Sequence, residues 1–194
     1  MALTGAQILD KLLSIFSSCS RVLVWVGGVL IILSAVLVSF EVLMRKFLNV
    51  SIGGADELSG YAFGVATSFG MAYALFERAH IRVDALYSVF PGWLKMVANL
   101  IGLAMLGGFV GVICVTAWGL VADSLTYSSR SITPMRTVLA VPQIPWLVGW
   151  LFFLLCTALL FVACVVAILS GKYKYAERLI GAKTIDEQID DEAP

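Results

Sequence analysis

Charged side chains are missing from four long stretches of this sequence, 22–40, 58–76, 96–122 and 137–171, and all 13 basic and 13 acidic residues lie outside them. About 20 apolar residues in a helix cross the hydrocarbon core of a bilayer. The four stretches therefore predict an all-α integral membrane protein with four transmembrane helices. We place these spans at about 22–43, 58–76, 96–122 and 145–170.

The sequence also lacks the residues of most catalytic and metal sites. It has one histidine, His80, and its four cysteines lack the close pairing of a zinc site. One histidine cannot supply both axial ligands of a haem, and no catalytic serine, zinc-protease or phosphate-loop motif occurs. We therefore expect no enzyme and no cofactor, and a formal net charge of zero makes a nucleic-acid surface unexpected.

Apolar residues dominate what remains. The hydrophobic share is 60%, so polar surface is too scarce to coat a soluble globule, and four spans leave no room for a second domain. We expect residues 1–194 to form a single membrane domain. The stretch 172–194 opens with basic residues and closes on acidic ones, a composition that cannot bury a core. It is predicted to be a cytoplasmic tail with a disordered end.

Two segments outside the spans have the pattern of amphipathic helices. In 5–20, apolar residues recur at three- and four-residue spacing, which is typical of a helix lying on the membrane surface. A plain extension of the first span explains this segment equally well. The second segment, 79–90, mixes apolar residues with His80, Arg82 and Asp84, and we expect it to lie at the interface between two spans.

The two ends of the chain are predicted to share one side of the membrane. Placing both termini inside puts nine Lys and Arg residues on the cytoplasmic side and four on the opposite side, as the positive-inside rule requires. The last span contains Pro142 and Pro145, which suit the start of a helix better than its middle. We expect this crossing to begin near Pro145 and to end near Ser170.

Few ionisable groups approach the spans. A transporter working alone normally carries them near the bilayer midplane, and here the nearest is Glu41, followed four residues later by Arg45. Two interpretations stay open: an interfacial pair whose side chains reach water, and a proton or substrate site. Asp56 and Glu57 open the second span, where the helix dipole favours acids.

Small residues recur every four positions in the second span, at Gly60, Gly64, Ser68 and Ala72. Such spacing permits close approach of helix backbones. The sequence does not decide between a packing face for another membrane subunit and packing within the four helices themselves.

From Glu41 onward the sequence resembles a known family, the small membrane subunit (Q subunit, DctQ type) of tripartite ATP-independent periplasmic, or TRAP, transporters. The motifs that carry the resemblance are Glu41-x-x-x-Arg45-Lys46-Phe47-Leu48-Asn49-x-Ser51, Asp56-Glu57-Leu58-Ser59, Ala79-His80-Ile81-Arg82-Val83-Asp84 and Pro142-x-x-Pro145-Trp146. One departure is Gly53-Gly54-Ala55 ahead of Asp56, where the family often has a tryptophan.

The resemblance implies a bacterial inner-membrane protein that forms a heterodimer with a large sodium-coupled membrane subunit. A periplasmic solute-binding protein would deliver a small solute, such as an organic acid. This chain would be a non-catalytic scaffold in contact with membrane lipids, and its loop 124–135 would touch the binding protein. The residues that the resemblance implies in partner or scaffold contacts are Glu41, Arg45, Asn49, Ser51, Asp56, Glu57, His80, Arg82 and Asp84. The small-residue spacing adds Gly60 and Gly64 to these candidates. The alternative is an autonomous, homodimeric, proton-coupled carrier that uses Glu41.

Overall fold

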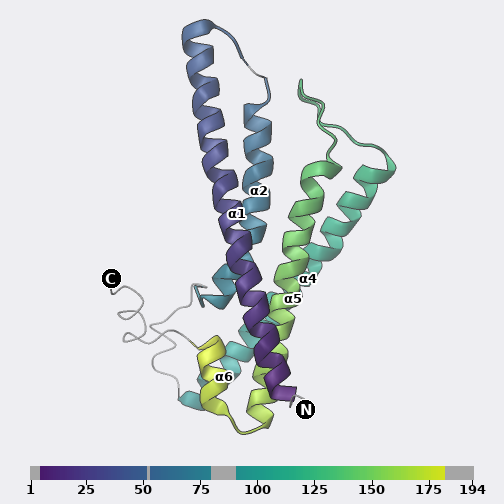
Figure 1. The fold of residues 1–194 in the computed structure, drawn as a ribbon. Helices are drawn as coiled ribbons and strands as arrows, with labels where there is room; N and C mark the ends of the chain where they lie inside the picture. The colour runs from purple at the N-terminus through teal and green to yellow at the C-terminus, as the bar shows by residue number, and fades with distance from the viewer. Residues whose placement is uncertain (1–4, 52, 80–90, 182–194) are drawn as a thin grey trace, which may run out of the picture.

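The computed structural model describes residues 5–51, 53–79 and 91–181, and the regular elements over this part are all helices (Figure 1). They are α1 (Gly5–Leu48), α2 (Ala55–Phe76), α4 (Gly92–Thr126), α5 (Ala140–Leu169) and α6 (Tyr173–Ile180). The all-α prediction is confirmed. Residues 80–90, with His80, Arg82, Asp84 and the predicted interfacial helix, lie outside the described residues, as do 182–194 with the predicted disordered end.

Three of these helices, α1, α4 and α5, are long and apolar enough to cross a membrane. The protein is therefore a multi-pass membrane protein. The fourth predicted span, 58–76, coincides with α2, which ends at Phe76 as expected. Helix α2 has no stretch as apolar as those of the other three, because glycine, serine, threonine and tyrosine interrupt it. Its crossing stays a prediction at this point.

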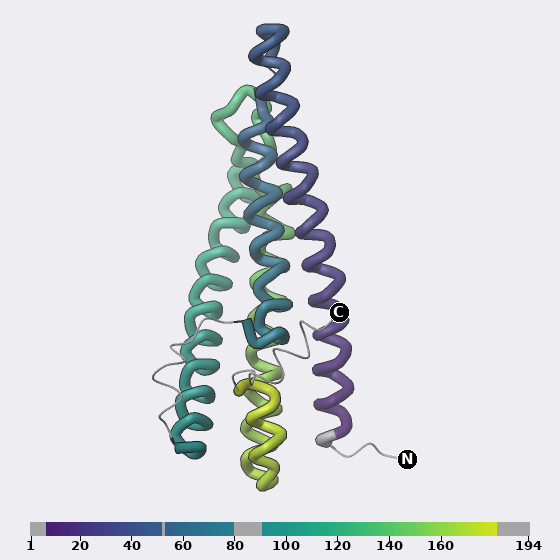
Figure 2. The backbone as a smooth tube through the Cα atoms, turned by 90° about the vertical axis from the view of Figure 1, so that its left-hand side faces the viewer, coloured from purple at the N-terminus to yellow at the C-terminus, as the bar shows by residue number. Residues whose placement is uncertain are grey.

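Helix α1 is continuous from Gly5 to Leu48, and it runs nearly the full height of the molecule (Figure 2). At 1.5 Å per residue its 44 residues extend about 66 Å, twice the thickness of a hydrocarbon core of about 30 Å. Residues 5–20 thus form one helix with the first span, in agreement with the alternative that this segment is a plain extension of that span. The helix must project well beyond the hydrocarbon.

Helix α5 begins at Ala140, ahead of both prolines. Its first turn is held by backbone bonds from the Val141 N–H to the Val138 carbonyl (3.0 Å) and from the Gln143 N–H to the Leu139 carbonyl (3.3 Å). Pro142 lies in that first turn, where an N–H has no partner within the helix in any case. Pro145 lies inside the helix and deprives one carbonyl of its donor.

The helices form two antiparallel hairpins, α1 with α2 and α4 with α5, which diverge towards the top of Figure 1. Helix α2 packs against α5 between them, and the main buried cluster lies in the lower part of the bundle. At its centre Val110, Phe153 and Cys156 are at most 1% exposed. Phe16 of α1 stacks on Phe152 of α5, with ring centroids 5.5 Å apart.

The small residues of α2 pack within this chain. Ser68 and Ala72 are completely buried, and a methyl group placed on Gly149 of α5 would lie 2.3 Å from the Ser68 hydroxyl oxygen. A methyl group on Gly64 would lie 3.8 Å from the Trp146 ring. Only Gly60 of this stripe is exposed. Of the two interpretations of the stripe, the structure supports packing between this chain's own helices.

A sharp reversal leads from α5 into α6. Gly171 has a φ of 70°, a left-handed conformation that glycine adopts freely, and the Lys172 N–H donates to the Ala167 carbonyl (2.9 Å). Ala176 and Ile180 of α6 are buried against the bundle. The prediction that the segment after Lys172 buries no core is therefore wrong for 173–180, because a few well-spaced apolar residues give this charged segment one apolar face.

Candidate functional site at the hairpin end

The turn between α1 and α2 is organised around the carboxylate of Glu41. The Ser51 hydroxyl donates to Glu41 Oε1 at 2.5 Å, and the Gly53 N–H donates to Ser51 Oγ at 3.1 Å. Asn49, directly after α1, has a φ of 52° and Gly53 a φ of 73°, and asparagine and glycine are the residues that best tolerate such values. The local sequence therefore suits a tight turn after Leu48.

Glu41 is buried, with 7% of its surface exposed, whereas Arg45 one turn further along α1 is exposed. A buried carboxylate is costly unless hydrogen bonds compensate for the lost water. The Ser51 hydroxyl supplies one such bond. The arrangement thus fixes the turn to the last part of α1.

The first turn of α2 contains Asp56 and Glu57, as the sequence indicated, and Glu57 makes a contact across the bundle. Its Oε1 accepts a hydrogen bond from the Tyr61 hydroxyl at 2.7 Å, and its Oε2 accepts one from the Thr133 hydroxyl. These two hydrogen bonds lower the pKa of the Glu57 carboxyl from 4.5 to about 2, and the bond from Thr133 has the larger effect. Glu57 is therefore ionised at neutral pH, and the charged carboxylate joins α2 to the α4–α5 loop.

The α4–α5 loop, residues 127–139, is a narrow hairpin. Arg130 and Val138 form an antiparallel bridge, the Ser131 N–H donates to the Thr137 carbonyl (2.9 Å), and the Thr137 N–H donates to Ser131 Oγ (3.1 Å). The Ser131 and Thr133 hydroxyl oxygens lie 2.6 Å apart. These bonds hold Thr133 at the tip of the loop, facing Glu57.

A second contact joins the same two segments. A methyl group placed on Gly54 would lie 1.9 Å from the sulfur of Met135, so the Met135 side chain occupies the space that any side chain at position 54 would need. Gly54 belongs to the motif that departs from the family pattern, where a tryptophan is common. In this chain glycine at position 54 has no side chain, and this leaves room for Met135.

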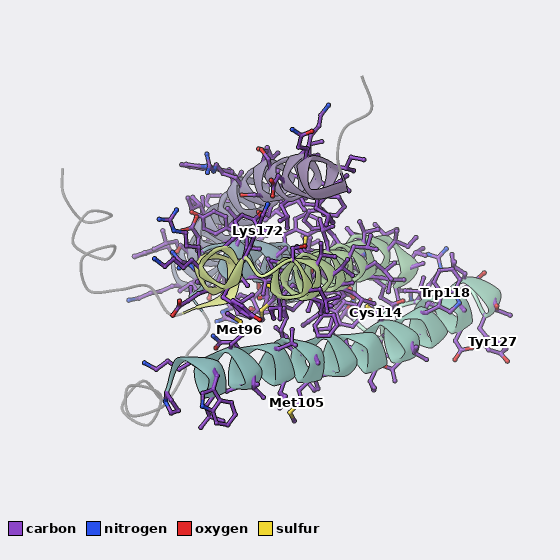
Figure 3. All side chains as sticks on the ribbon, turned by 90° about the horizontal axis from the view of Figure 1, so that it is seen from below. Met96, Met105, Cys114, Trp118, Tyr127 and Lys172 are labelled. Atoms are coloured by element: carbon purple, nitrogen blue, oxygen red, sulfur yellow. The ribbon has the colours of Figure 1, made fainter. Side chains whose placement is uncertain are left out.

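Large apolar side chains cover the outer faces of α1 and α4. Figure 3 shows Met105 pointing away from the bundle, while Cys114 is on the side of α4 that faces α5. Met105 is 71% exposed and Cys114 is 5% exposed. Other exposed apolar residues on these two helices are Trp25, Ile32, Val36, Phe109, Val112, Val115 and Trp118. Both faces are suited to lipid or to another membrane protein.

The structure thus brings Glu41 together with Ser51, and Glu57 together with Thr133, at one end of the bundle. Sequence reasoning named the loop 124–135 as a whole without singling out Thr133 or Met135, and it missed Tyr61. One feature of the sequence could have indicated these contacts. The loop 127–139 is rich in serine and threonine, and it was predicted on the same side of the membrane as the acidic start of the second span. Within the described residues no group of three or more His, Cys, Asp or Glu side chains could hold a metal ion.

Helices with long uncharged stretches, joined by polar contacts near their ends, define a multi-pass membrane protein of the helical-bundle type. The family model for the DctQ component of tripartite ATP-independent periplasmic transporters matches residues 34–171. The chain belongs to this family, which confirms the resemblance seen in its motifs. No curated protein and no solved structure matches the chain.

Proposed function

We propose that this chain is the small permease subunit of a TRAP secondary transporter in the bacterial inner membrane. It serves as a non-catalytic scaffold that forms a heterodimer with the large sodium-coupled subunit. It also helps a periplasmic solute-binding protein to dock, so that a small solute such as an organic acid is taken up. The family match supports the transporter assignment, and the division of labour is our inference.

The observation that carries the scaffold role is the distribution of charge. Ions and protons crossing a membrane need ionisable partners near the midplane, yet the predicted spans contain a single charged residue, Glu41, close to the end of the first. Its carboxylate is bonded to Ser51 in the adjoining turn. A chain of this kind is better suited to support a moving partner than to conduct a solute itself.

Chain direction supports a fourth crossing by α2. Helices α1 and α4 both begin near the lower end of the molecule and run upwards (Figure 2). If both cross the membrane in the same direction, the chain must return between them, and α2 is the helix that does so. Its 22 residues extend about 33 Å, enough for a hydrocarbon core of about 30 Å. Both termini are then cytoplasmic and the hairpin end is periplasmic.

The hairpin end is the part that we assign to the binding protein. The contacts of Thr133 and Met135 with the start of α2 hold the α4–α5 loop beside the α1–α2 turn. Ile132, next to Thr133, is fully exposed at the loop's tip. A fixed polar platform with one exposed apolar side chain is suited to a partner that binds and leaves repeatedly.

The test is to co-express the tagged chain with the large subunit of the same transporter and to purify it in a gentle detergent. We expect the two subunits to elute together in equal amounts. Liposomes that contain only this chain should take up no solute. Sodium- or proton-driven uptake by the lone chain, abolished by Glu41→Gln, would instead establish the autonomous carrier.

A further inference from the structure

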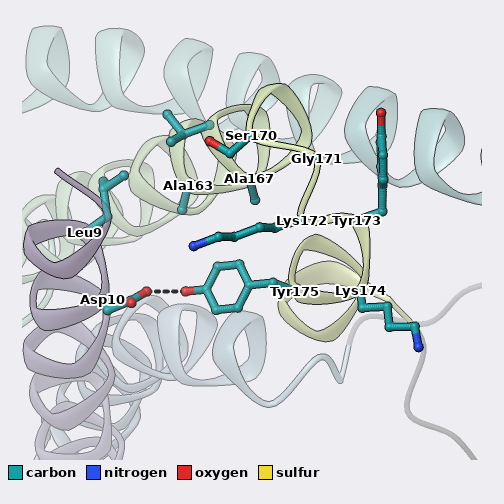
Figure 4. A pocket seen from close by; sticks show the side chains of 11 residues that line it. Leu9, Asp10, Ala163, Ala167, Ser170, Gly171, Lys172, Tyr173, Lys174 and Tyr175 are labelled. Carbon is teal, nitrogen blue, oxygen red and sulfur yellow. Dashed lines mark hydrogen bonds between the residues drawn. The ribbon is translucent and has the colours of Figure 1, made fainter. Parts of the chain in front are cut away.

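A second polar site lies at the opposite end of the bundle, between the start of α1, the end of α5 and α6 (Figure 4). The Tyr175 hydroxyl of α6 donates a hydrogen bond to a carboxylate oxygen of Asp10 in α1. Beside this bond is a cavity of about 680 Å³, a volume typical of small-molecule sites. Neither the family assignment nor the proposed scaffold role accounts for it.

The walls of this cavity are apolar on one side. Leu9 of α1 and Ala163, Val166 and Ala167 of α5 line it, and Val166 is partly exposed towards the outside of the bundle. These α5 residues belong to the last turns of a membrane-crossing helix. The apolar wall therefore begins at the depth of the lipid chains.

The other side of the cavity carries a positive charge. Figure 4 shows the Lys172 side chain extending above the Tyr175 ring towards α1. Lys174 also lines the cavity, but its amino group points away from Asp10 and Lys172. In the described part of the chain the Lys172 amino group makes no ion pair. Asp10 accepts its hydrogen bond from Tyr175, and among the described residues Lys172 is therefore available to an external anion.

We propose that this cavity binds one anionic phospholipid, with the headgroup phosphate at the Lys172 amino group and an acyl chain along Leu9, Ala163 and Val166. Basic pockets between transmembrane helices on the cytoplasmic side bind anionic headgroups, and a lysine stem lies readily on apolar surface while its amino group meets a phosphate. Residues 172–181 carry three basic side chains and one acidic side chain. An anionic lipid is therefore favoured over a zwitterionic one.

The two lysines provide a matched pair for the test, because each substitution removes one charge from the same short segment. The full-length chain is purified in detergent and titrated with dioleoyl phosphatidylglycerol or dioleoyl phosphatidylcholine, and bound lipid is counted by native mass spectrometry. The unaltered chain should bind phosphatidylglycerol roughly five times more tightly, as expected for one basic group near a headgroup. Lys172→Gln should lose this preference and Lys174→Gln should keep most of it.

Two further variants probe the same site. Asp10→Asn removes the one acidic group among the described residues that line the cavity. It keeps an oxygen that accepts from Tyr175, so it should tighten phosphatidylglycerol binding. Val166→Trp should obstruct the path of the acyl chain and weaken the binding of both lipids. Circular dichroism spectra matching that of the unaltered chain would show that the variants remain folded.

Several results would overturn the proposal. Equal binding of the two lipids by the unaltered chain, or equal loss of preference in Lys172→Gln and Lys174→Gln, would mean that no defined site exists. Displacement of bound lipid by inorganic phosphate at constant ionic strength would indicate a site for a free anion. A protein dimer that excludes lipid would assign the cavity to a second copy of the chain.

Discussion

The hydroxyl group of Thr133 donates a hydrogen bond to the carboxylate of Glu57, although the two residues are 76 positions apart in the chain. The bond joins the tip of the α4–α5 loop to the first turn of α2, at the end where the two helical hairpins diverge (Figure 1). It is the contact on which a rigid hairpin end most directly depends.

Removing the hydroxyl should loosen the loop without disturbing the core. Thr133→Val keeps the shape of the side chain and deletes the donor, so amide hydrogen exchange in 127–139 should become several times faster. Thr126→Val is the control, because Thr126 is exposed and its hydroxyl donates only within its own helix, to the Ala122 carbonyl. Unchanged exchange in Thr133→Val would show that the bond does not hold the loop.

The same bond should make the loop sensitive to acid. The pKa of Glu57 is lowered to about 2 in the folded protein, chiefly by the Thr133 hydroxyl. A lowered folded-state pKa stabilises the structure above the unfolded value of 4.5 and loses this effect as the pH falls towards 2. The protection of amides in 127–139, which is their exchange rate compared with the intrinsic rate at the same pH, should therefore fall across this interval. In Glu57→Gln this pH dependence should disappear, and its persistence would assign the acid sensitivity to another group.

The contact between Gly54 and Met135 can be tested by a double-mutant cycle. Gly54→Ala forces the Met135 side chain out of its position and should cost about 1 kcal/mol of stability, at the lower end of the range for overpacking. Met135→Ala alone should have a small effect, since this side chain is 43% exposed. Together the two changes should be less harmful than Gly54→Ala alone. Additive losses in thermal unfolding would argue against direct contact.

Neighbouring glycines in α1 offer a sharper comparison. A methyl group on Gly27 would lie 3.2 Å from the Cα and carbonyl oxygen of Ala66 in α2, whereas one on Gly28 meets nothing within 4 Å among the described residues. Gly27→Val should destabilise the protein by about 1–3 kcal/mol, and Gly28→Val should change stability far less. Both carry the same helix propensity change, so the difference measures packing alone. Equal effects would mean that α1 and α2 are not in close contact there.

Ser51→Ala should weaken the turn after α1. The substitution removes the hydroxyl that donates to the buried Glu41 carboxylate and accepts from the Gly53 N–H. A loss of about 1 kcal/mol is expected for the removal of one hydrogen bond, since Glu41 also has an interaction besides that with Ser51. Ser39→Ala is a suitable control, because the Ser39 hydroxyl bonds only to the Ala35 carbonyl of its own helix. Thermal unfolding of both variants in the same detergent would compare the two losses.

The positions of the long helices could be predicted from sequence because the bilayer sets one physical requirement, about 20 uncharged residues per crossing. The ends of α5 and α1 were harder to predict. A helix tolerates Pro142 and Pro145 near its start, and α1 continues beyond the hydrocarbon in both directions from the span 22–43. Composition also concealed α6, where charged residues outnumber the two buried ones.

The site was predictable only in part. Glu41 and Glu57 were singled out by their place at the ends of spans and Ser51 by the family resemblance, yet their partners depend on tertiary structure. Nothing in the local pattern around Thr133 or Met135 indicates a contact with a segment so distant in the chain. The small residues of α2 were also predictable only in part. Their spacing indicated a packing face, but it did not show which helix packs against that face.

The unbroken length of α1 has a mechanical consequence. With no proline between Gly5 and Leu48, one continuous helix ties the Ser51 turn at one end of the molecule to Asp10 at the other. Adjacent glycines are a common point of bending in a helix, so a displacement of the Ser51 turn reaches Asp10 only as far as Gly27 and Gly28 stay straight.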